Sequence, residues 1–556
     1  MATTARPATT VPPPQATHDV TNQAPPMAPL NLFTTNTPLV EALEREGGGW
    51  AHARATEIGA AWGDVPLREW GPQANEHKPV LRTHDRYGNR IDEVEFHPAW
   101  HSLMALASEH ELHALPWTSP QDGAHVARTA MYVTSGQAEA GHGCPITMTF
   151  AAIPALRTTP AVAAEWEHLL TAPAYDGTLA PAHEKGSAKC GMGMTEKQGG
   201  SDVRANTTTA TAIGATGAGE EYLLRGHKWF TSAPMCDLFL VLAQTDEGVG
   251  CFAVPRILPD GTRNAFALQR LKDKLGNHSN ASSEVEFDNT WGRMVGDPGR
   301  GVPTIIEMVG HTRLDCIIGS ASNMRAAVAN ATWHAAHRSA FGKTLVDQPL
   351  MQNVLADLCL ESEAATALAM RLARAYDEGD VALRRLGTAV GKYWVCKRSP
   401  GVAFEALECL GGNGYVEESG MPRLYREAPL NSIWEGSGNV NALDVLRALS
   451  RQPQTLAAYF DELALAGGAD GRYDAFVDGL RAEFADTHAI EVRARRVVEK
   501  LALAWQASLL LRHAPHAVGD AFCAARLAGD SGLAFGTLPA GIDFRAIIDR
   551  GMPVAA

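Results

Sequence analysis

The chain has 556 residues, of which 45% are hydrophobic and 20% charged, and its net charge is −14 at pH 7. This length exceeds one ordinary core, so we expect two to four domains. The acidic balance excludes a general polyanion-binding protein but leaves room for a local basic patch. No apolar run reaches membrane-spanning length and the N-terminus has no apolar signal core, so we expect a cytoplasmic protein with no membrane partner, with an organellar address left open.

The first 28 residues are rich in Pro, Thr and Ala and have little apolar content to bury, so we expect residues 1–28 to be a disordered extension. The pattern that follows is mainly helical. In Leu39–Arg45, for example, apolar residues recur at helical spacing. We therefore predict an N-terminal helical domain over residues 29–187.

The central part of the chain has a period of two, and glycine and threonine become frequent there. No helical pattern separates its apolar runs, so we expect a small antiparallel sandwich or barrel over residues 188–300. The predicted strands are Glu221–Phe230, Leu238–Ala243, Gly250–Val254 and Ser283–Phe287.

Long helices return after residue 300, with apolar residues at three- and four-residue spacing, and predict a helix bundle over residues 301–450. A polar break at Arg451 is followed by more helical sequence, which predicts an extra helical domain over residues 451–556. The expected fold class is α+β, with helical regions on both sides of a β-domain. The clearest helical stretches are Met324–Arg338, Pro349–Glu378, Val381–Leu410 and Ala485–Leu511.

Neither the cysteines nor the histidines indicate a metal site. The nine cysteines include no Cys-x-x-Cys pair, and several stand in apolar surroundings, so we expect buried free thiols in a reducing cytosol. His97 and His101 have the spacing of two ligands on a helix, but Pro98 lies between them and no third ligand is nearby. We therefore favour packing or capping around Trp100, and predict no metal.

A glycine-rich stretch, Gly191–Asp202, reads Gly-Met-Gly-Met-Thr-Glu-Lys-Gln-Gly-Gly-Ser-Asp. Glycines let backbone amides approach a planar ligand such as a flavin closely. Alone this is a weak signal, but the predicted strand that follows it ends in His227–Ser232, a segment with several aromatic and hydroxyl side chains. Trp229 and Phe230 could instead belong to the barrel core, and for Phe230 we favour that alternative.

Two further stretches follow in the helical part. His337–Gly342 contains an Arg-x-x-Phe-Gly pattern, and the guanidinium fork matches phosphate geometry. Asn431–Asn439 reads Asn-Ser-Ile-Trp-Glu-Gly-Ser-Gly-Asn, with the single carboxylate Glu435. It is preceded by Leu410–Tyr415 and Pro422–Glu427. On its own, Glu435 would be read as a carboxylate at a helix start.

Together and in this order, the stretches resemble the acyl-CoA dehydrogenase family of flavoproteins. The resemblance implies an FAD cofactor, with Glu435 as the base that removes the substrate α-proton. A nicotinamide-binding fold is not expected, because the glycines after Leu410 follow a helical pattern rather than a strand. The Gln that contacts FAD in the family has two candidates here, Gln348 and Gln352. By resemblance the FAD-binding residues are Met194, Thr195, Gly200, Ser201, Trp229, Thr231, Ser232, Arg338, Phe341, Gln348, Gly411, Gly412, Trp434, Ser437 and Asn439.

The resemblance is closest to the branch of this family that serves the bacterial adaptive response to DNA alkylation. It is dense over residues 30–450 and looser beyond. It implies a homotetramer that binds double-stranded DNA through the extra C-terminal domain and has weak isovaleryl-CoA dehydrogenase activity. The additional motifs that carry it are Arg45–Trp50, Phe96–His101, Cys144–Phe150 and Leu271–Gly276.

The charge of the C-terminal part gives less support for DNA binding. From Arg451 onward, eleven Lys and Arg stand against thirteen Asp and Glu. The best local cluster would form one basic stripe on a helix, with Glu491 and Glu499 nearby. A salt-bridged solvated face and a phosphate track are therefore both open. The residues predicted for DNA contact are Arg493, Arg495, Arg496 and Lys500.

Three functions remain open at this point. The first is FAD-dependent dehydrogenation of a short or branched acyl-CoA, with Glu435 as base and Trp434 crowding the pocket. The second is a flavoprotein that protects duplex DNA after alkylation or inactivates alkylating agents, with turnover secondary. The third is flavin oxidation of a small molecule without CoA.

Overall fold

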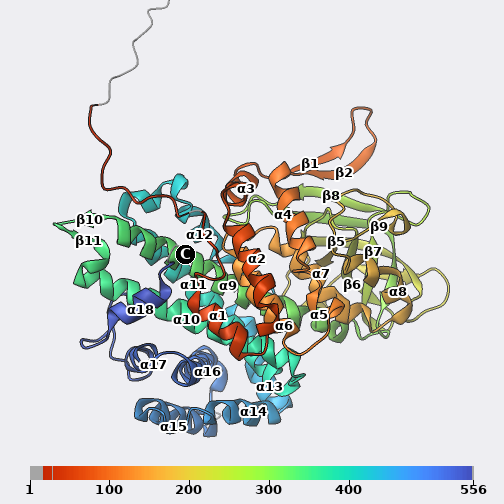
Figure 1. The fold of residues 1–556 in the computed structure, drawn as a ribbon. Coiled ribbons are helices and arrows are strands. Elements are labelled where there is room, and N and C mark those ends of the chain that lie inside the picture. Colours follow the sequence, from red (N-terminus) through yellow and green to blue (C-terminus); the bar gives the residue numbers. More distant parts are fainter. Residues whose placement is uncertain (1–16, 28, 487, 554–556) are drawn as a thin grey trace, which may run out of the picture.

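The computed structural model describes residues 17–27, 29–486 and 488–553. A β-domain lies to one side of a helical body, and the N-terminal helices stand between the β-domain and the long C-terminal helices (Figure 1). The α+β class with helices before and after a central β-domain is confirmed. Among the described residues, no helix combines the length and the apolar composition that crossing a bilayer requires.

The N-terminal region is helical as predicted, except for an antiparallel hairpin of strands β1 (Val80–His84) and β2 (Arg90–Glu95). Most of its helices bury Leu, Trp and Ala side chains at helical spacing against the long helices of the bundle, whereas the last one and much of the one before it pack into the core of the β-domain. They are α1 (Thr37–Arg45), α2 (His52–Gly63), α3 (Val65–Glu76), α4 (Pro98–Glu109), α5 (Leu115–Thr118), α6 (Ala124–Gly136), α7 (Gly143–Leu156) and α8 (Pro160–Leu170).

The side chain of His97 accepts a hydrogen bond from the backbone N–H of Ala99, 3.2 Å away, and so caps α4. The expected capping role is therefore confirmed. All nine cysteines are buried free thiols, as predicted.

The β-domain has seven strands whose pairings close into a ring, β5–β4–β6–β7–β9 and back to β5, with β3 and β8 attached. The four predicted strands are confirmed as β5, β6, β7 and β9. Strand β6 is buried along most of its length because its run of Leu, Phe and Val fills the ring. The strands are β3 (Cys190–Gly193), β4 (Thr209–Ala212), β5 (Glu221–Ser232), β6 (Leu238–Thr245), β7 (Gly248–Pro255), β8 (Phe266–Leu271) and β9 (Ser282–Val295).

Three long helices form the bundle: α9 (Gly301–His337), α10 (Pro349–Asp377) and α11 (Val381–Cys409). A short hairpin, β10 (Ser339–Ala340) and β11 (Lys343–Thr344), connects α9 to α10 and projects from the body (Figure 1). Two shorter helices follow on the bundle, α12 (Met421–Glu427) and α13 (Gly438–Arg451).

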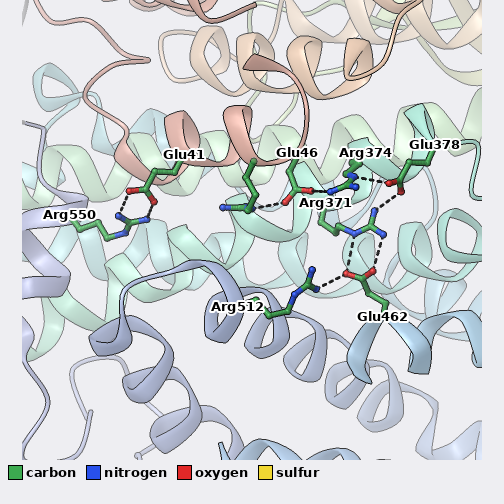
Figure 2. A network of polar contacts seen from close by, with 9 residues as sticks. Glu41, Glu46, Arg371, Arg374, Glu378, Glu462, Arg512 and Arg550 are labelled. Carbon is green, nitrogen blue, oxygen red and sulfur yellow. Dashed lines mark hydrogen bonds and ion pairs between the residues drawn. The ribbon is translucent and has the colours of Figure 1, made fainter. Parts of the chain in front are cut away.

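The C-terminal helices pack on the bundle, with α16 against α10, α11 and α13. Ion pairs tie them in place: on α14, Glu462 is bound by Arg371 at 2.9 Å and by Arg512 at 3.1 Å (Figure 2). Buried pairs of this kind fix orientation more than they add stability. The helices are α14 (Gln454–Ala464), α15 (Gly471–Ala485), α16 (Ile490–His513), α17 (His516–Phe522) and α18 (Phe544–Gly551).

Part of the Pro-rich extension is described. Residues 17–27 contain no helix or strand, and they contact the end of α9 and hairpin β10–β11 through Asn22 and Pro25. This differs from the expectation of disorder over residues 1–28. Residues 1–16 and 28 lie outside the described residues.

Candidate active site

Glu435 lies in the turn before α13, and its backbone is in the left-handed region, with φ of 56°. A side chain other than glycine in this conformation costs roughly 1 kcal/mol and usually marks a functional constraint. Three side chains hold the turn. Arg313 of α9 donates to the Glu435 carbonyl at 2.9 Å, and the Gly436 carbonyl accepts from Lys392 of α11 at 3.1 Å and Asn441 of α13 at 2.6 Å.

The Glu435 carboxylate itself accepts one hydrogen bond, from the Thr312 hydroxyl to Oε2 at 2.7 Å. Burial raises the pKa of Glu435, while the Thr312 hydrogen bond and the charges of Arg313 and Lys392 act in the opposite direction. Asp444 binds Arg313 at 2.8 Å, so that cation is already paired. The result is a half-buried carboxylate, and the neighbouring cations bind the backbone of the turn rather than the carboxylate oxygens.

The turn meets the β-domain next to Trp434. Its indole N–H donates to the Asn431 side chain at 2.8 Å, and its ring packs against the β-domain core. Cys144 of α7 lies at the same junction. Burial raises the pKa of Cys144 to about 12, and this thiol also interacts with the Ser232 hydroxyl and the Glu435 carboxylate. The end of β5 and the Glu435 turn therefore converge, as a site between the two regions requires.

A buried ion pair anchors the glycine-rich stretch to β5. Lys228 and Glu196 are both fully buried and lie 2.7 Å apart. Burial alone would raise the pKa of Glu196, but the Lys228 bond and hydrogen bonds from Thr207 and Thr208 lower it overall. Burial lowers the pKa of Lys228 to about 8. Glu196 belongs to the motif, but nothing in the sequence indicated that it pairs with Lys228.

Thr231 at the end of β5 is 1% exposed, and its hydroxyl has no hydrogen-bond partner in the described part of the chain. An orphaned buried hydroxyl costs about 1 to 3 kcal/mol unless a ligand satisfies it. Thr195 lies close by, because its backbone carbonyl accepts a hydrogen bond from the backbone N–H of Trp229 at 2.8 Å. These residues fit a flavin, whose ring carries hydrogen-bonding atoms along its edge.

The expectation that Phe230 belongs to the barrel core is wrong, because its side chain is 51% exposed. The β5–β9 register shifts between Lys228 and Thr231, so the inward positions go to these two residues. Trp229 lies beside Phe230 and is partly buried, with the Lys272 ammonium 3.4 Å from its ring centre. The same ammonium pairs with Glu284 at 2.6 Å.

The remaining predicted FAD residues lie in four parts of the fold: the glycine-rich stretch, the start of α13, hairpin β10–β11 and the end of α11. Met194 and Gly200 flank Thr195 in the glycine-rich stretch, Ser201 beside them is exposed, and Ser437 and Asn439 are exposed at the start of α13. Arg338, Phe341 and Gln348 stand at hairpin β10–β11, where Gln348 donates to the Ala340 carbonyl at 2.9 Å. Gly411 and Gly412 are exposed beyond the end of α11. In the described structure, no contact joins the hairpin or Gly411–Gly412 to Glu435.

The predicted DNA-contact residues do not form a free basic stripe. Glu483 of α15 binds Lys500 at 2.5 Å, Arg493 at 3.5 Å and Arg496 at 3.6 Å. Arg495 lies apart from this cluster, on the side of α16 near Tyr393 of α11, with its guanidinium carbon 5.9 Å from the ring centre. The acidic partner comes from another helix, so the spacing within α16 could not indicate it.

Three family models match the chain. They are the adaptive response protein AidB N-terminal domain over residues 22–177, the acyl-CoA dehydrogenase middle domain over residues 191–290, and the acyl-CoA dehydrogenase C-terminal domain over residues 299–450. AidB of Escherichia coli (strain K12) is 44% identical over 513 residues, which is 91% of this chain and 94% of that protein. This chain is an AidB-like member of the acyl-CoA dehydrogenase family. The resemblance drawn from the motifs is thereby confirmed.

Other members of the acyl-CoA dehydrogenase family are more distant. Acyl-CoA dehydrogenase family member 11 of Caenorhabditis elegans is 30% identical over 410 residues, which is 70% of this chain and 65% of that protein. The crystal structure of C. elegans ACDH-11 in complex with C11-CoA superposes with a TM-score of 0.84 at 25% identity, over 94% of this chain and 95% of that one.

Proposed function

We propose that this protein is an FAD-dependent dehydrogenase of acyl-CoA thioesters, with Glu435 as its catalytic base. The observation that carries the proposal is the Glu435 turn: a strained, half-buried carboxylate whose oxygens accept a single hydrogen bond from the described residues. A base near a flavin must be shielded from water and able to reach a carbon-bound proton. The ACDH-11 complex with C11-CoA supports an acyl-CoA as the substrate class.

In this proposal the residues of the chain divide the work. Glu435 takes the proton from the α-carbon of the thioester, and its raised pKa makes it a stronger base. When bound, FAD supplies the acceptor for the hydride that leaves the β-carbon, so the substrate gains a carbon–carbon double bond. Thr231 and the glycine-rich stretch hold the flavin edge, and Trp434 limits the width of the acyl pocket.

The test is an anaerobic titration of the purified FAD-loaded protein with isovaleryl-CoA and with a straight-chain acyl-CoA. We expect the flavin absorbance to bleach in proportion to the substrate added. FAD that stays oxidised with every acyl-CoA would contradict the proposed dehydrogenation. A protein that takes up no FAD would contradict the cofactor as well.

We place a role in the response to DNA alkylation second, and the match to the adaptive-response family model supports it. In this role the FAD-loaded homotetramer binds double-stranded DNA and protects it. The Glu483 cluster argues against a simple phosphate track along α16, and leaves Arg495 outside that cluster. Duplex binding measured against salt tests this role, because each engaged cation makes the slope steeper. Absence of binding at low salt would leave dehydrogenation alone.

A further inference from the structure

Residues 17–27, here named the N-terminal strap, form a hydrogen bond with Arg338, the arginine that the family resemblance assigns to the FAD phosphates. Arg338 donates through Nη1 to the Asn22 carbonyl at 2.6 Å. The Asn22 side chain binds both backbone groups of the next residue. Its Oδ1 accepts from the Ser339 N–H at 2.7 Å, and its Nδ2 donates to the Ser339 carbonyl at 2.9 Å.

The strap is anchored on both sides of this contact. Trp333 of α9 donates its indole N–H to the Pro25 carbonyl at 2.8 Å, and Met27 packs against the hydrophobic core. Asn22 itself has a φ of 56°, a conformation that Asn tolerates better than most residues. Asn22 is therefore held in one position by its left-handed backbone and by its three hydrogen bonds with Arg338 and Ser339.

The contact leaves the binding edge of Arg338 available. A guanidinium has five N–H donors, and the strap engages Nη1 only. In the described residues, Nε and Nη2 make no hydrogen bond, and these two atoms form an edge that can bind a phosphate with two parallel bonds. A free arginine loses rotamer freedom when it binds, whereas an arginine already held loses less.

We propose that Asn22 is a positioning residue for the cofactor. It orients Arg338 so that the Nε–Nη2 edge meets an FAD phosphate. The inference rests on the proposed function, because it takes FAD as the ligand and Arg338 as a phosphate contact. The family resemblance implies that this arginine pairs with the flavin pyrophosphate across a subunit boundary, and in such an assembly the strap would support a site outside its own chain.

The experiment measures the FAD affinity of full-length apoprotein by the quenching of flavin fluorescence. We expect Asn22→Ala to weaken FAD binding by about five- to tenfold, which corresponds to the loss of ordinary hydrogen bonds. Asn22→Gly permits the left-handed backbone but lacks the side chain, so it should also weaken binding. Gln23→Ala is the matched control, because Gln23 is exposed and forms no hydrogen bond within the described chain. It should bind FAD as the unchanged protein does.

A double-mutant cycle with Arg338→Ala separates positioning from a purely structural role. If Asn22 acts through Arg338, adding Asn22→Ala to Arg338→Ala should not weaken FAD binding further. Unchanged or tighter FAD binding in Asn22→Ala, or full additivity in the cycle, would overturn the proposal. Failure of the unchanged protein to bind FAD would overturn the proposed function together with this inference.

Discussion

Glu435 and Glu483 are two carboxylates among cations, and the structure uses the cations in opposite ways. At Glu435, the cations Arg313 and Lys392 bind backbone carbonyls of the turn, and among the described residues only Thr312 donates a hydrogen bond to the carboxylate. At Glu483, three cations bind the carboxylate directly. Burial raises the pKa of Glu435. Burial would raise that of Glu483 too, but its cations lower it overall.

The difference shows what makes a carboxylate reactive. A base has to remain poorly solvated and unpaired, so its supporting charges must bind something else. At Glu435 the backbone carbonyls of the turn bind the cations, so the carboxylate stays unpaired. At Glu483 the carboxylate and the cations pair with each other. The number of nearby charges therefore says less about function than the atoms those charges bind.

The largest expected effect comes from Glu435→Gln. The amide keeps the size of the side chain but cannot accept the α-proton, so flavin reduction by an acyl-CoA should slow by about 10²- to 10⁴-fold. FAD binding should be unchanged, which visible absorbance checks. If the variant reduces its flavin at the original rate in stopped-flow measurements, Glu435 is not the base.

Lys392→Met should have the next largest effect, which is on the free energy of unfolding. It removes the donor to the Asn431 carbonyl at 2.5 Å and the Gly436 carbonyl at 3.1 Å. The Asn431 carbonyl would lose this donor and the Gly436 carbonyl would keep only Asn441, so the free energy of unfolding should fall by about 1 to 3 kcal/mol, measured by urea denaturation. The control is Lys397→Met, on the same helix and partly exposed, for which we expect less than about 0.5 kcal/mol. Equal effects would contradict the anchoring role.

Thr312→Val should change the pH dependence of kcat/KM, and so tests how the Glu435 carboxylate is supported. The Thr312 hydrogen bond favours the charged carboxylate and so lowers the pKa of Glu435. The base works only when charged, so the rate falls as pH drops through this pKa. Without the hydroxyl the pKa should rise, and the acidic limb of kcat/KM should move to higher pH, while the plateau changes by less than about tenfold. A limb that moves to lower pH, or not at all, would contradict this assignment.

The smallest effect is expected from Glu483→Gln. It should release Arg496 and Lys500, leave Arg493 to Asp486, and lower the free energy of unfolding by less than about 1 kcal/mol. If duplex DNA contacts this face, affinity at low salt should rise and its dependence on salt should become steeper. Glu491→Gln is the control, since Glu491 is exposed on α16 and forms no ion pair in the described structure. A slope equal to that of the control would exclude this face from DNA contact.

The ordered motifs predicted the family and the three-part arrangement, because a flavin site needs small residues, a carboxylate and hydroxyls at set places along the chain. Period-two and helical patterns located β5, β6, β7 and β9 and the long helices. The clearest error is Phe230, because the β5–β9 register shifts between Lys228 and Thr231 and Thr231 is buried there in its place. Lys228, just before the shift, can be buried because it pairs with Glu196.

Other features could not be predicted from the sequence because they depend on distant segments. Thr312 and Arg313 lie more than a hundred residues before Glu435, as their hydrogen bonds with it record. Lys392 belongs to yet another helix. No short-range spacing connects such residues, so only the packed bundle shows that they support one turn. Glu483 could not be predicted as the partner of the α16 cations for the same reason, because it lies on α15.

The last helix has a consequence for how the chain is made. Arg550 of α18 binds Glu41 of α1, which lies 509 residues earlier in the chain (Figure 2). Arg550 also binds Glu363 of α10. At roughly 5 to 20 residues per second, the ribosome adds Arg550 on the order of 25 to 100 s after Glu41. Glu363 is made later, 187 residues before Arg550, so its interval without this cation is on the order of 9 to 37 s at the same rate. The long helices of the bundle are therefore synthesised before the arginine that joins α18 to α1 and α10.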